Sequence, residues 1–127
     1  MKQLLWTLAF AVVLIGVLFF LQEGLNDTLN YVDDSLTVLE RQLDAEQWPQ
    51  AEETVDKIVE RWESGRKIWE MFIDHHHVDQ AEASLYALQA HVHGKADSAH
   101  YKEQIAILRH GCKHILKQNK LGIGNVL

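Results

Sequence analysis

The sequence predicts an all-α protein in which an N-terminal transmembrane helix is followed by an antiparallel helical bundle of about four helices. Three observations predict this architecture. The chain opens on a long uncharged stretch, apolar residues then recur at helical spacing, and no segment alternates apolar with polar residues as a half-buried strand does. We therefore expect residues 1–23 to form a membrane anchor and residues 24–127 to form one helical domain.

The stretch Leu4–Leu21 determines where the protein lies. It carries no charge, and Thr7 and Gly16 are its non-hydrophobic members. A helix of this length covers about 27 Å, close to the roughly 30 Å hydrocarbon core of a bilayer. Because a helix pairs its own backbone groups there, we expect a single membrane pass.

The flanks of this stretch indicate its orientation and its fate. Lys2 and the α-amino group precede it, and positive charge tends to stay cytoplasmic, so the following domain is expected to be extracytoplasmic. The residues after Leu21 lack an A-x-A-like cleavage site, which favours an uncleaved signal-anchor over the alternative, a cleaved signal peptide. The one cysteine, Cys112, excludes a lipoprotein and an internal disulfide, and its place on an apolar stripe predicts a buried thiol.

The charge pattern narrows the choice of partners. Without Lys2, eleven basic side chains stand against eighteen acidic ones, which argues against a nucleic-acid partner. Residues 23–74 hold fourteen acidic and five basic side chains, whereas residues 95–127 hold two and six. We expect the last helix to lie against the acidic first half, in the same chain or in a neighbouring copy. A basic C-terminal segment on anionic lipid is the alternative.

The first helix after the anchor carries an apolar seam with steps of three and four residues. Its members, called the leucine seam below, are Leu25, Leu29, Val32, Leu36, Leu39 and Leu43. The spacing fits packing inside the domain and packing against a second copy equally well. Gly24 is a single candidate hinge, and without a hinge the helix runs straight out of the bilayer.

A second helix is expected to begin at Pro49, because proline is tolerated in the first helical turn. Its apolar face, the aromatic stripe, consists of Trp48, Ala51, Val55, Ile58, Trp62, Trp69 and Phe72, with Ile73 alongside. Core packing is the favoured interpretation of these bulky side chains, and an aromatic ligand groove is the alternative.

Two more helices complete the predicted bundle. Val78, Ala81, Leu85, Leu88 and Val92 define a third, which Gly94 is expected to close as a glycine C-cap. Asp97 or Ser98 caps a fourth, with Tyr101, Ile105, Leu108, Cys112 and Ile115 on its stripe and lysines near its negative end. The segment Leu121–Leu127 contains two glycines and is expected to be irregular.

All eight histidines lie between His75 and His114. We expect the run from Asp74 to His77 to end the second helix or to form the turn after it. His110 and His114 are four residues apart, a usable spacing for two metal ligands on one helical face. The candidate metal ligands, all weak, are His75, His76, His77, His110 and His114. Solvated or partly buried histidines are the favoured interpretation, and a pH response is a further hypothesis.

No catalytic or cofactor motif is present in the sequence. It contains no HExxH, no paired CxxC, no Glu-x-x-His di-iron pattern, no G-x-S-x-G elbow and no glycine-rich phosphate loop. The many carboxylates fall on the solvated faces of amphipathic helices. We therefore expect no enzyme activity and no cofactor.

Several short motifs resemble a known family. They are Trp48-x-x-Ala51, Trp62, Trp69, the run Phe72-Ile73-Asp74-His75, the pair His114-Ile115 and the closing Asn125-Val126-Leu127. Together they resemble domain-of-unknown-function family 4363, small membrane-anchored proteins of Gram-positive bacteria, over nearly the whole chain. The resemblance implies an uncharacterised, single-pass, envelope-facing helical protein. It also makes His75 and His114 the polar positions to test.

The sequence thus predicts a signal-anchored helical module with a protein-interaction or scaffold role at the bacterial cell envelope. The expected partner is another protein or a second copy, met by Leu29, Val32, Leu36, Leu39, Trp48, Trp62 and Trp69. The rival function is a histidine-rich extracytoplasmic metal-binding domain.

Overall fold

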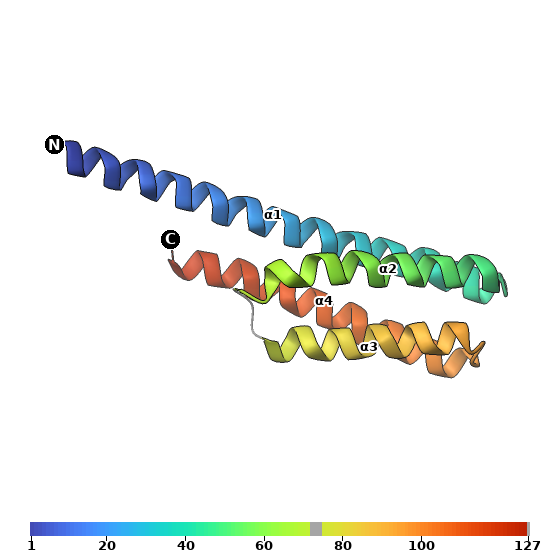
Figure 1. The fold of residues 1–127 in the computed structure, drawn as a ribbon. Coiled ribbons are helices and arrows are strands. Elements are labelled where there is room, and N and C mark those ends of the chain that lie inside the picture. The colour runs from blue at the N-terminus through green and yellow to red at the C-terminus, as the bar shows by residue number, and fades with distance from the viewer. Residues whose placement is uncertain (72–74, 127) are drawn as a thin grey trace.

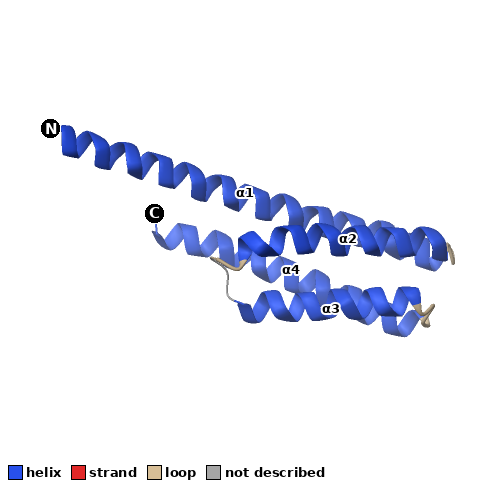
Figure 2. Ribbon diagram, in the orientation of Figure 1, coloured by secondary structure: helices blue, strands red, loops and turns tan. Residues whose placement is uncertain are grey.

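Four helices make up the protein, as a computed structural model shows (Figures 1 and 2). It describes the backbone of residues 1–71 and 75–126, and the side chains of all of these except 75 and 119–126. The helices are α1 (Lys2–Asp44), α2 (Trp48–Trp69), α3 (His75–His93) and α4 (Ser98–Val126). No strand occurs in these ranges, which confirms the predicted all-α class.

The helices form an antiparallel ring. Each helix packs against its neighbour in the chain, and α4 closes the ring by packing against α1. The α1–α2 and α3–α4 turns lie at one end of the bundle, whereas the end of α2, the start of α3 and the end of α4 lie at the other (Figure 1). Short connections between long helices favour this up-and-down arrangement.

The core is built from the apolar stripes that the sequence predicts. Every member of the leucine seam is buried, with 2% exposure at most. The stripes of α2, α3 and α4 face it with Trp62, Leu85, Leu108 and their neighbours on each helix. The seam therefore packs inside its own domain, which decides between the two arrangements that the spacing allowed.

Among the residues that the structure describes, the first half of α1 has no packing partner. The large apolar side chains from Leu4 to Phe20 are exposed, with exposed fractions between 48% and 79%. This segment is long and apolar enough to cross a membrane, with a mean hydropathy of 2.8 over eighteen residues. The helix continues through Gly24 into the core without a break, which is the second of the two possibilities that the sequence left open there.

Specific residues begin and end the helices of the bundle. Pro49 lies in the first turn of α2, and Asp97 Oδ1 accepts the His100 N–H at 3.4 Å to cap α4, as the sequence predicts. The end of α3 differs. Gly94 keeps a negative φ, and Lys95 adopts the left-handed conformation, with the Lys95 and Ala96 N–H groups donating to Val92 O and His91 O.

Two expectations about local structure are wrong. The two glycines of Leu121–Leu127 predict an irregular segment, yet α4 continues to Val126 and carries both of them within the helix. His75–His77 neither end α2 nor form a turn, because they are the first residues of α3. Phe72, Ile73 and Asp74 fall outside the described residues.

Two tryptophans of the aromatic stripe lie in the core along the second half of α2, which ends at Trp69. The Trp62 and Trp69 rings meet edge to face, with centroids 5.0 Å apart, and both are buried. Gly65 makes room for this pair, because a Cβ there would lie 2.5 Å from Trp69 Cζ2. The favoured core interpretation of these two side chains is confirmed.

Candidate functional site

The residues predicted to meet a partner lie inside the bundle. Leu29, Val32, Leu36, Leu39 and Trp62 are fully buried, Trp69 is 2% exposed, and Trp48 is partly buried against the core. Spacing identified the leucine seam on α1 and the aromatic stripe on α2, but it could not show that the two pack into one core with α3 and α4. A partner must therefore contact other side chains.

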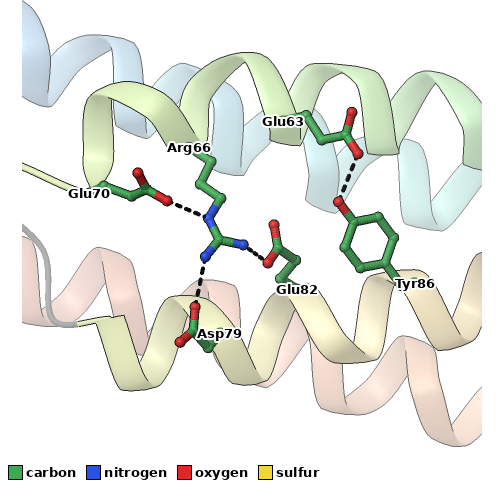
Figure 3. A network of polar contacts seen from close by, with 6 residues as sticks. All are labelled: Glu63, Arg66, Glu70, Asp79, Glu82 and Tyr86. Carbon is green, nitrogen blue, oxygen red and sulfur yellow. Dashed lines mark hydrogen bonds and ion pairs between the residues drawn. The ribbon is translucent and has the colours of Figure 1, made fainter.

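A polar network joins α2 to α3 on the outside of the bundle (Figure 3). The Arg66 guanidinium donates to Glu70 Oε1 at 2.9 Å and to Asp79 Oδ1 at 3.0 Å, and it also forms an ion pair with Glu82. Glu82 is only 12% exposed, so its charge depends on Arg66 more than the other carboxylates do. One guanidinium thus holds three carboxylates across two helices.

A second contact between these helices lies farther from the anchor. Tyr86 donates its hydroxyl to Glu63 Oε1 at 2.7 Å, a bond that raises the pKa of Tyr86. Sequence analysis missed this pair and the Arg66 network. The i, i+4 spacing of Arg66 and Glu70 was a usable signal, but contacts between helices depend on a register that spacing does not give.

Asp56 joins α2 to α3 near the end of the bundle opposite the anchor. Its Oδ1 lies 2.7 Å from His93 Nε2 and accepts a bond from Gln89 at 2.9 Å. The hydrogen bond to Asp56 raises the pKa of His93. Burial opposes ionisation of Asp56, but its bonds to His93 and Gln89 outweigh that effect and lower the pKa of its carboxyl.

Contacts between α4 and α1 confirm the expected match of charge within one chain. Arg109 donates to Thr37 Oγ1 at 2.8 Å and lies 3.9 Å from Asp33 and 3.8 Å from Glu40.

Burial, with the nearby Asp33 charge, raises the pKa of the Cys112 thiol to about 12. Cys112 is therefore the predicted buried, unreactive thiol.

Four of the five candidate metal ligands form a chain of imidazole rings between α3 and α4. The His76 and His77 centroids lie 5.6 Å apart, those of His77 and His114 4.4 Å, and those of His110 and His114 6.5 Å. The fifth, His75, has its side chain outside the described part. The ring of His77 also lies 3.4 Å from the Gln118 amide.

This chain of rings is a row of pairs and not a closed cage. Within the described ranges, no group of three or more histidine, cysteine or carboxylate side chains has the geometry to hold a metal ion. His110 is exposed, and His114 is half-buried beside His77. Zinc requires three or four convergent ligands, so the arrangement favours solvated and partly buried histidines.

A shallow hollow lies between α1 and α2 on the described surface. The Arg61 guanidinium lies 5.3 Å from the Tyr31 ring centroid there, a cation–π contact that covers the aromatic face. The hollow is open to solvent, about 240 Å³ in volume, and lined by Tyr31, Lys57, Glu60, Arg61 and Ser64. It offers little enclosure to a small ligand.

A family model for a domain of unknown function, DUF4363, matches residues 19–126. The chain belongs to this family. Family 4363 is the one that its aromatic and histidine motifs resemble, and the match takes in the whole described bundle. It begins near the end of the apolar stretch, so most of the candidate span lies outside the match. No curated protein matches the chain, and no solved structure does.

Replacing Arg66 tests whether this network carries stability. Arg66→Met should lower the free energy of unfolding by about 1–3 kcal/mol, because it leaves the Glu82 carboxylate poorly solvated and unpaired. Urea unfolding followed by circular dichroism measures the loss. Lys67→Met, at the exposed next position, should change stability by about 0.5 kcal/mol or less. Adding Glu82→Gln to Arg66→Met should restore part of the lost stability. If Arg66→Met and Lys67→Met lower the free energy of unfolding equally, this account is contradicted.

The pair Asp56 and His93 should make stability depend on pH. A raised pKa of His93 in the folded state adds stability that is present below its unfolded pKa and is lost as pH rises through the folded one. The wild type should therefore gain stability over His93→Gln as pH falls from about 8 to about 5. Asp56→Asn should bring the pKa of His93, followed by NMR, back toward its ordinary value. An unchanged titration would show that Asp56 does not set it.

Proposed function

We propose that the chain is a single-pass, membrane-anchored helical module that presents its bundle outside the cytoplasm at the bacterial cell envelope. Its role is to hold a protein-binding surface at a fixed place beside the membrane. One observation carries this proposal: α1 is a single helix whose apolar first half packs against nothing and whose second half supplies the leucine seam. The exposed apolar side chains of the first half are favourably surrounded by lipid, and the leucine seam of the second half is buried only when the other helices cover it.

The surface for a protein partner belongs to the exposed side chains. Val38 on α1, Tyr86 on α3 and Ile107 on α4 are large apolar residues of the bundle that are 40–44% exposed. They lie on different helices, so they sample different faces. Scattered exposed apolar residues are common, which is why the partner surface has to be mapped by experiment.

The location is tested by cysteine labelling of the full chain in intact bacterial cells. Ala99→Cys places an exposed thiol at the start of α4, at the end opposite the anchor. A membrane-impermeant maleimide should label it before the cells are broken. Native Cys112 is the internal control, because its buried thiol should react only after denaturation. Labelling at position 99 only after permeabilisation would place the bundle in the cytoplasm and contradict the proposal.

The scaffold role is tested by photo-crosslinking from the exposed faces. A photoreactive amino acid at Val38, Tyr86 or Ile107 should give a discrete adduct from at least one position when cells are irradiated. An adduct of twice the chain's mass identifies self-association, and another mass identifies a different protein. Absence of adducts from all three positions, with the variants present in the membrane fraction, would contradict a protein-binding role.

A further inference from the structure

The register of the helices fixes which end of the bundle faces the anchor. Tyr101 on α4 bonds to Asp44 on α1, and Arg109 bonds to Thr37, so the two helices run antiparallel with matched steps. Continued at the same rise, this register places Lys117 level with about Thr28, and Val126 level with about Phe19. The last turns of α4 thus reach the height at which the apolar stretch of α1 ends.

The end of α2 and the start of α3 reach the same region. Thr54 bonds to Gln42, and Arg61 covers Tyr31, so α2 descends along α1 until Met71 lies near the level of Gly24. Asp79 meets Arg66 and Gln118 meets His77, which places the first turn of α3 beside the end of α2 and beside α4. We call this region the membrane-facing end.

The height of this end matches the headgroup layer of a bilayer. Gly24 lies three residues after Leu21, the last residue of the uncharged stretch, which is a rise of about 5 Å in a straight helix. The headgroup region adds roughly 5–7 Å on each side of the hydrocarbon core. Because α1 passes Gly24 without a break, the membrane-facing end lies within reach of lipid headgroups.

The exposed side chains of this end suit an anionic bilayer surface. Met71 is 83% exposed and Ile68 is 45% exposed, although both are large apolar residues. The exposed lysines Lys67 and Lys117 accompany them, whereas Lys113 lies one turn farther from the apolar stretch, level with about Val32. Of the nearby carboxylates, Glu70 and Asp79 are bonded to Arg66, while α1 contributes the exposed Glu23 and Asp27.

The opposite end has a different character. Its turns and the adjoining helical residues carry an excess of carboxylates, although basic side chains are present and Lys57 pairs with Glu53. The carboxylates are Asp44, Glu46, Glu53, Asp56 and Asp97. The bundle is therefore charged asymmetrically along its length. Lysines beside a bilayer attract anionic lipid at roughly 1 kcal/mol each, whereas the acidic end would be repelled.

We propose that the membrane-facing end is a bilayer-docking surface whose partner is the anionic phospholipid headgroup. Ile68 and Met71 enter the interface, and the long side chains of Lys67 and Lys117 reach toward lipid phosphates. This inference rests on the proposed membrane anchor. Docking adds a second contact with the membrane and holds the bundle upright on the surface, with its acidic end directed away from the lipid.

The test uses the full chain in lipid nanodiscs, with a nitroxide label on one introduced cysteine in a Cys112→Ala background. Met71→Cys reports the membrane-facing end, Ala99→Cys the opposite end, and Leu14→Cys the span. The ratio of oxygen to nickel-chelate accessibility measures depth. With phosphatidylglycerol present, the ratio at position 71 should exceed that at position 99 several-fold. It should fall in purely phosphatidylcholine discs and on adding Lys67→Gln with Lys117→Gln.

The label at position 14 separates this inference from the proposed anchor. Equal ratios at positions 71 and 99 in anionic discs, with position 14 deep, would overturn docking and leave the anchor intact. If the accessibility ratio at position 71 changes neither with lipid charge nor with the two lysine substitutions, the anionic headgroup is not the partner. A water-exposed position 14 would overturn the anchor, and docking with it.

Discussion

The structure depends on one long helix with two different surfaces. The first half of α1 presents exposed apolar side chains and is long and apolar enough to cross a membrane, whereas in the second half the apolar side chains narrow to the buried leucine seam. Because the backbone stays helical through Gly24, the height and direction of the bundle follow from those of the span. A flexible tether would leave both undetermined.

The remaining helices follow from the need to cover the leucine seam. Apolar stripes on α2, α3 and α4 supply the burial, and Trp62 and Trp69 pack edge to face where Gly65 gives them space. Polar contacts then fix which helix lies beside which. Arg66 joins α2 to α3, and Arg109 joins α4 to α1, so a guanidinium bonded to several partners lies at two of the four helix contacts.

The sequence predicts what depends on periodicity and fails where geometry in three dimensions decides. The seam, the tryptophan core, the buried Cys112 and the cap at Asp97 all follow from local spacing. The end of α3 does not, because Lys95 takes the left-handed conformation that glycine usually takes. Neither does the row of His76, His77, His114 and His110, since helix register brings α3 and α4 histidines together. The glycines near the C-terminus predicted a break, but their helix penalty of about 1 kcal/mol each does not stop α4.

Continuity of α1 across the membrane surface is the central claim, and hydrogen exchange of the full chain in nanodiscs tests it most directly. Backbone amides from Gln22 to Asn26 should exchange as slowly as those of the neighbouring turns that carry Leu29 and Val32, because all belong to one helix. Fast exchange confined to Gln22–Asn26, with slow exchange on both sides, would reveal a flexible joint. The bundle would then have no fixed height above the bilayer.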